Sequence, residues 1–225
     1  MSVLSVAVRR AAHKLVPTQL PAYVVASFGR SGSTMLQATM ASGLAFARFG
    51  SRHRFFRKAC ASTAWNLDHA LLEPGITYKT HDYPAGLRGR KRVRALFIFG
   101  SAVDAARSAY VLGRGDSRWM RGHASNLKRS GVRAEDLLQG DALGFLDQAR
   151  AWSRFREVPT LCVRFESLWD QVEALRDFTG LPLHLPARRE RTSKVVPNDV
   201  ERKLKSEFGP IDEELARLPA ITILP

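Results

Sequence analysis

The residue types best suited to chemistry stand in a short loop from Gly29 to Thr34, after an apolar run and before an apolar helical pattern. Glycine lets the backbone turn sharply and approach a ligand closely, and this loop carries Gly29 and Gly32. The N–H groups of Ser31 to Thr34 can then converge on a phosphate at a helix N-terminus, and Arg30 adds a fixed positive charge. The loop therefore indicates an anion site, although a Ser-Gly-Ser-Thr turn can also be a plain helix cap.

The loop departs from the phosphate loop of ATP-binding proteins at two positions. That motif reads G-x-x-x-x-G-K-[ST], whereas this chain has Ser27 where the first glycine belongs and Ser33 where the lysine belongs. We therefore expect a phosphate site that does not hold ATP with magnesium, and we expect no metal ion. A small-molecule kinase is the third-ranked interpretation of the chain.

A second pair of reactive side chains, Lys79 and His81, stands near the end of an apolar run. Side chains two positions apart on an extended strand share a face, so these two are expected to point the same way. With an intrinsic pKa of about 6.5, an imidazole can take a proton from an acceptor hydroxyl. A neighbouring lysine can stabilise charge that develops on a transferred group or its leaving oxygen. A single histidine is often structural, and the pair alone does not decide between these roles.

Strand and helix patterns alternate along the chain, and the strand centres are continuously apolar, as in parallel strands covered on both faces. The predicted strands lie near 22–28, 76–80, 92–100 and 160–165, and the predicted helices near 33–42, 104–111, 143–156 and 167–178. We therefore predict an α/β fold, a P-loop-like three-layer sandwich with a central parallel sheet flanked by helices. Its ligand crevice is expected beyond the C-terminal ends of the strands.

The length of 225 residues and the 45% hydrophobic content suit one domain with a substantial core. We expect this domain over residues 21–225, after a short amphipathic lead-in segment over residues 1–20.

Two further segments of the chain have a distinctive composition. Residues 46–58 interleave aromatic and basic side chains, which is typical of a polyanion-binding surface or of a solvated basic face. Residues 113–142 read either as a mobile lid with Trp119 and Met120 exposed or as a disordered connection.

The chain is strongly basic, with 35 Lys plus Arg against 21 Asp plus Glu and a formal charge of +14. Such a field favours an anionic partner, either a nucleic acid or a small anionic ligand or acidic acceptor. No zinc-finger, basic-zipper or aromatic RNA-binding pattern stands out, so nucleic acid is the less favoured partner.

Cys60 and Cys162 are expected to be core thiols. No apolar stretch reaches the length of a membrane span, and we expect a cytoplasmic protein.

Four segments, in this order, resemble one family, the sulfotransferases that use 3′-phosphoadenosine 5′-phosphosulfate (PAPS). FGRSGSTML resembles the family loop that grips the 5′-phosphosulfate, and YKTHDYP resembles its K-T-H-x-x-P strand end. ALFIFGSAVDAARSAY resembles the strand-turn-helix that grips the 3′-phosphate, and LCVRFESLWD with LRDFTGLPL resembles the family's V-R-Y-E-D-L and F-L-G-L-P stretches. The resemblance covers roughly residues 22 to 183.

The resemblance implies a role for each matching residue. It makes His81 the general base and directs Lys79 toward the sulfuryl group. Asp104 matches the family's helix-start acid, and Ser108 matches its 3′-phosphate hydroxyl. The implied cradle of the 5′-phosphosulfate consists of Arg30, Ser31, Gly32, Ser33 and Thr34.

The chain departs from the family pattern at two places. Gly100 stands where the family has an arginine for the 3′-phosphate, and Arg107 is the candidate substitute. The family's late Arg-Lys-Gly-x-x-Gly stretch is replaced by LPARRERTSKVV, which is either a closing segment over the nucleotide or a solvated basic tail. In this segment the candidate ligands are Arg188, Arg189, Arg191 and Lys194, with Thr192 and Ser193 as caps. Without such substitutes the domain would be degenerate and bind weakly or not at all.

The sequence therefore predicts a sulfotransferase that transfers a sulfuryl group from PAPS to a hydroxyl or amine of a carbohydrate or small-molecule acceptor. The alternative from another class is a non-catalytic basic module that binds nucleic acid or another polyanion through residues 46–58 and the C-terminal basic tract.

Overall fold

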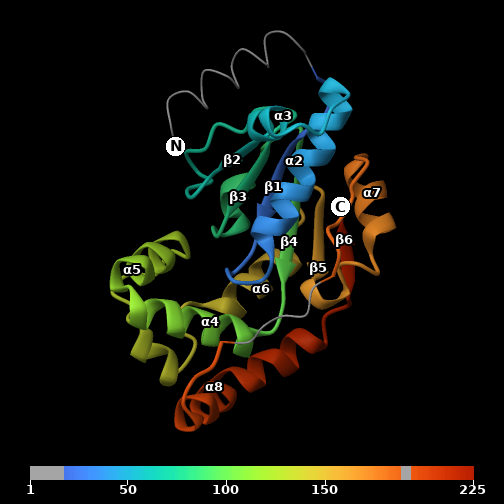
Figure 1. Cartoon of the computed structure of the whole chain (residues 1–225). Helices are drawn as coiled ribbons and strands as arrows, with labels where there is room; N and C mark the ends of the chain where they lie inside the picture. The colour runs from blue at the N-terminus through green and yellow to red at the C-terminus, as the bar shows by residue number, and fades with distance from the viewer. Residues whose placement is uncertain (1–17, 189–193) are drawn as a thin grey trace.

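The computed structural model describes residues 18–188 and 194–225 of the chain. These residues form a six-stranded sheet in the order β2-β3-β1-β4-β5-β6, with helices on both sides (Figure 1). All pairs are parallel except β5 with β6. The strands are β1 Ala22–Ala26, β2 Ala61–Thr63, β3 Thr77–Thr80, β4 Val93–Phe99, β5 Thr160–Arg164 and β6 Ile221–Leu224. The predicted lead-in segment lies almost wholly outside the described residues.

Seven α-helices occur in the described residues, and three short 3-10 helices supplement them. The α-helices are α2 Ser33–Phe49, α3 Arg54–Ala59, α4 Ala102–Gly115, α5 Ser117–Asn126, α6 Phe145–Arg154, α7 Val172–Thr179 and α8 Asn198–Ala216. The 3-10 helices are η1 Pro84–Leu87, η2 Ala134–Leu138 and η3 Phe165–Ser167.

The alternation of side chains along β1 divides the core into two layers. Val24 packs into a cluster with side chains of α4, α6 and α8, whereas Tyr23 and Val25 pack with α2 and α7 on the other face (Figure 1). All five residues of β1 are buried, as expected for a strand covered on both sides. The predicted α/β three-layer sandwich is confirmed.

The predicted end of the first helix at residue 42 is wrong, because α2 continues to Phe49. Gly43 does not stop the helix but lies buried inside it, facing the segment after α7. A Cβ added to Gly43 would lie 2.8 Å from Leu183 Cδ2, so this position lets the two segments approach closely. The helix ends at Gly50, whose φ of 65° allows a left-handed cap.

The prediction for residues 113–142 is also wrong in one respect. The segment contains α5 and η2, and Met120 is 1% exposed in the core rather than presented to solvent. Trp119 is partly buried and packs against the core. The polar composition hid an amphipathic helix whose apolar face packs against α4.

The C-terminal helix α8 was not predicted, and it supports the start of α4. The Asp212 carboxylate accepts hydrogen bonds from the Ser101 hydroxyl (2.7 Å) and from the backbone N–H groups of Ala102 and Val103. These N–H groups have no partner within α4, and a carboxylate also suits the positive end of the helix dipole.

The buried residues of the described ranges include both cysteines, which are unpaired, as expected for core thiols. Among the described helices, none combines the length and the apolar composition that crossing a bilayer requires.

We expect Asp212→Ala to lower the free energy of unfolding by about 2 kcal/mol, because α4 loses an N-terminal cap that comes from a distant helix. Urea denaturation measures this loss. Asp177→Ala, at an exposed position of α7, is the matched control. Equal losses in the two variants would contradict a stabilising role for the contact between α8 and α4.

Candidate functional site

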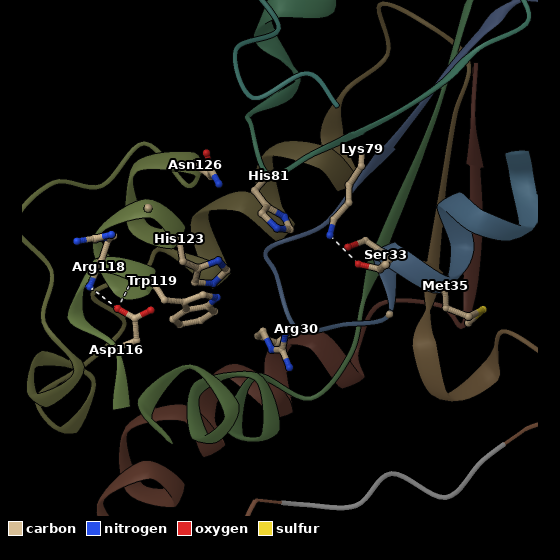
Figure 2. Close-up of a pocket in the computed structure, with 13 residues that line it drawn as sticks. Arg30, Ser33, Met35, Lys79, His81, Asp116, Arg118, Trp119, His123 and Asn126 are labelled. Atoms are coloured by element: carbon tan, nitrogen blue, oxygen red, sulfur yellow. Dashed lines mark hydrogen bonds between the residues drawn. The ribbon is translucent and has the colours of Figure 1, made fainter. Parts of the chain in front are cut away.

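A cavity of about 650 Å³ opens at the C-terminal ends of β1 and β3. One wall is the loop after β1 with the start of α2, together with Lys79 and His81; the opposite wall is α5 (Figure 2). The lining residues are Arg30, Gly32, Ser33, Thr34, Met35, Lys79, His81, Asp116, Arg118, Trp119, Gly122, His123 and Asn126. Parallel α/β sheets bind ligands at this edge, where the strand order changes direction.

The loop between β1 and α2 adopts a sequence of left-handed conformations. Gly29, Arg30 and Gly32 have φ values of 88°, 55° and 85°. Gly32 has a second constraint, because a Cβ there would lie 2.4 Å from the Phe165 ring. Among the described residues, no side chain caps α2. This geometry leaves the first-turn N–H groups available for an anion, and it does not match the plain capping turn.

The serine and threonine side chains of the loop have different surroundings. Ser31 is buried, and its hydroxyl donates to the Ile98 carbonyl of β4 at 3.2 Å, so it anchors the loop to the sheet. Ser33 and Thr34 line the cavity, and Thr34 Oγ1 accepts a 2.7 Å hydrogen bond from Lys79 Nζ. That bond joins the loop to the end of β3.

The surroundings of Lys79 make its ammonium more acidic than usual. Burial lowers the pKa of Lys79, and the nearby Arg30 charge lowers it further. The Nζ atom lies 6.0 Å from the centre of the Trp65 ring. A lysine held this way can meet negative charge in the cavity at a fixed position.

His81 is 6% exposed and is oriented by the backbone of Ser27. Its Nδ1 lies 2.8 Å from the Ser27 carbonyl oxygen, and because a carbonyl can only accept, we assign the proton to Nδ1. Burial is the main cause that lowers the pKa of His81 to about 4, with Lys79 and Arg30 also lowering it. The imidazole is therefore neutral near pH 7, with the Nε2 lone pair available as a proton acceptor.

Arg30 and Ser108 come together from two segments that the sequence analysis treated separately. Arg30 Nε donates to Ser108 Oγ at 2.9 Å. The contact spans 78 positions of the chain and joins the loop after β1 to α4. Two of the candidate anion ligands are thus adjacent.

Arg107 and Asp104 lie elsewhere on α4 and are engaged with each other and with α8. The Arg107 guanidinium makes two hydrogen bonds to the Glu201 carboxylate, at 2.8 and 2.6 Å, and a third to Asp104. A phosphate at this position would have to compete with two carboxylates. Arg107 is therefore poorly placed to take the role of 3′-phosphate ligand that the resemblance suggests for it.

The surroundings of Gly100 are acidic. A hollow of about 400 Å³ beside it is lined by Asp104, Glu166, Asp212 and Arg164, among others. A Cβ added to Gly100 would lie 3.1 Å from Glu166 Oε1. The Arg164 guanidinium in this hollow donates to carbonyls at the end of α8. The residues here do not fit a bound 3′-phosphate.

The C-terminal candidates are only partly described. Arg188 donates to the Glu166 carbonyl oxygen at 3.1 Å, and its guanidinium lies 5.8 Å from the centre of the Trp169 ring. Arg189, Arg191, Thr192 and Ser193 lie outside the described residues, and Lys194 is exposed.

Ser27 and one face of α5 contribute to the cavity and its support but were not identified from the sequence. Ser27 fixes the His81 tautomer through its carbonyl, and its hydroxyl accepts the Gly29 N–H at 3.2 Å. The face of α5 that lines the cavity was missed because the segment was not predicted to be helical. Its residues Trp119, Gly122, His123 and Asn126 follow i, i+3, i+4, i+7 spacing, which was the available signal.

Comparison with protein-family models and with curated proteins found no match to this chain. Within the described residues, no group of three or more His, Cys, Asp or Glu side chains is arranged to hold a metal ion.

The pKa values of the cavity histidines predict acid-sensitive folding. His81 titrates at about 4 in the folded protein but at about 6.5 when unfolded, so below pH 6.5 the unfolded chain binds more protons. The contribution of His81 to the free energy of unfolding is therefore complete above about pH 6.5, and it is lost as the pH falls through about 4. We expect His81→Gln to reduce this pH dependence by roughly 3 kcal/mol in urea denaturation series. His69→Gln, at an exposed position, is expected to leave it unchanged.

Proposed function

We propose that the chain is a sulfotransferase that takes a sulfuryl group from PAPS and transfers it to an acceptor hydroxyl or amine. The proposal is carried by one arrangement: the loop after β1, the end of β3 and helix α4, joined by the Lys79–Thr34 and Arg30–Ser108 hydrogen bonds at the edge of one cavity. These segments are the ones that resemble the family motifs in sequence.

The donor, when bound, supplies an activated sulfuryl group, whose S–O bond breaks as a new bond to the acceptor forms. The backbone N–H groups at the start of α2 and the Arg30 guanidinium are suited to hold its 5′-phosphate end. Lys79 stabilises the charge on the leaving oxygen, and Nε2 of neutral His81 accepts the proton of the acceptor group.

The 3′-phosphate end of the donor fits this chain less well. Gly100 provides no charge, and Arg107 is bound to Glu201 and Asp104. Ser108 and Arg30 remain as contacts from described residues near the cavity. We therefore base the proposal on the 5′ side.

A specific observation also favours the alternative, a polyanion-binding module. In the segment 46–58, Arg48 and Arg52 donate to the carbonyls of Gly75 and Pro182, whereas Arg54, Arg57 and Lys58 are exposed. Phe55, between these cations, is 51% exposed. This surface has the composition of a polyanion site, and it predicts binding that weakens steeply with salt.

Thermal unfolding with added nucleotide tests the proposed function. We expect stabilisation by adenosine 3′,5′-bisphosphate, of about 2.7 kcal/mol at a hundred times its dissociation constant, and none by magnesium-ATP. 5′-AMP reports how much of the effect depends on the 3′-phosphate. An unchanged unfolding temperature with the bisphosphate, together with salt-sensitive binding of polyanions, would favour the polyanion-binding module instead.

Kinetics test the role of His81. We expect His81→Ala to lower turnover by about 10²-fold or more while the affinity for the bisphosphate changes little, because the imidazole acts on the acceptor proton. For the wild type, kcat/KM is expected to fall only as the pH drops through about 4, the pKa of His81 in the free protein. A fall centred on about pH 6.5 would contradict this assignment.

A further inference from the structure

His123, on α5, is a buried imidazole in the cavity wall that the proposed mechanism does not use. It is 7% exposed, and its Nε2 is inaccessible to solvent and has no hydrogen-bond partner in the described part of the chain. Leaving a buried polar atom unpaired destabilises the folded state, so such atoms are rare in folded proteins. The position therefore calls for a partner that the protein alone does not supply.

The contacts of the ring hold it in one orientation. Trp119 stacks on it with the ring centres 4.8 Å apart and an angle of 19° between the planes. The His81 ring meets it edge to face, with the centres 5.5 Å apart (Figure 2). These contacts and the loop backbone enclose Nε2, so an anion reaches it only when the ring or the loop shifts and the packing around the ring loosens.

The third contact joins His123 to the anion loop. A Cβ added to Gly29 would lie 2.4 Å from Cε1 of His123 and 2.9 Å from its Nε2. The absence of a side chain at Gly29 thus allows the Nε2 edge of the ring to lie against the backbone of the loop. The unpaired imidazole nitrogen therefore lies beside Gly29, the first residue of the loop whose last residues begin α2.

We propose that His123 is an anion-binding residue, which hydrogen-bonds through Nε2 to a phosphate-type or sulfate-type oxygen held at the Gly29–Thr34 loop and takes up a proton as that anion binds. This inference rests on the anion binding of the proposed function but not on the identity of the nucleotide or on sulfuryl transfer.

The charges around the ring explain why the proton should arrive with the anion. Burial lowers the pKa of His123 to about 3, and His81, Arg30 and Lys79 lower it in that order. Asp116, the N-cap residue of α5, and Arg118 on that helix are the other charged side chains that line the cavity. An anion among these cations reverses the local field, so the protonated ring gains a charge-assisted hydrogen bond.

Inorganic sulfate is the probe, because it stays fully ionised between about pH 5 and 8 and any proton uptake then belongs to the protein. Long-range ¹H–¹⁵N NMR spectra of the histidine side chains, recorded at about pH 6, distinguish neutral from protonated rings. We expect sulfate to convert the His123 signals of the full chain to the protonated pattern and to leave those of exposed His69 unchanged. The signals are assigned with His123→Gln and His69→Gln.

Affinity gives a second measurement. We expect His123→Gln to bind sulfate about tenfold more weakly, and His69→Gln to bind it as the wild type does. The proposal is overturned if sulfate fails to bind, if it binds without changing the His123 signals, or if both variants keep the wild-type affinity. If His123 responds to sulfate but adenosine 3′,5′-bisphosphate does not stabilise the protein, the anion site stands and the sulfotransferase proposal fails.

Discussion

The parallel pairing of β1 with both β3 and β4 is the constraint on which the cavity depends. Ala26, the last residue of β1, is in register with Thr80 on one side and Phe97 on the other. Because all three strands run in the same direction, their following segments emerge at one edge of the sheet. The loop from Gly29 to Thr34 and the side chain of His81 are therefore neighbours before any side-chain contact forms.

Hydrogen bonds then convert this proximity into a defined geometry. The Ser27 carbonyl sets the tautomer of His81. The side-chain amide of Gln148, on α6, donates to the backbone carbonyl of His81. On the other side, Thr34 holds Lys79. The result is a site with cations and uncharged imidazoles side by side. Burial keeps both imidazoles uncharged, because it penalises the protonated form of each ring.

The parts of the fold and site that could be predicted from sequence are those with local patterns. The loop glycines, the continuous apolar centre of β4 and the Lys79–His81 spacing each require only a few neighbouring residues to interpret. Gly43 could not be interpreted in this way, because its role depends on Leu183, which is 140 positions away. Likewise, the burial of Met120 and His123 depends on packing of α5 against the remainder of the molecule, and a polar composition does not reveal that packing.

Two helices, α2 and α4, start at the same edge of the sheet, but their positive ends are in different states. The N-terminus of α4 is occupied by the Asp212 carboxylate, with Glu166 nearby. The N-terminus of α2 faces Arg30 and Lys79 instead. The charge along this edge is thus uneven: cations line it over β1 and β3, whereas carboxylates gather beyond β4, with Arg164 beside them. An elongated ligand that is negative at one end only would enter this field in a single orientation, with its charged end over α2, before any specific contact with the rest of it had formed.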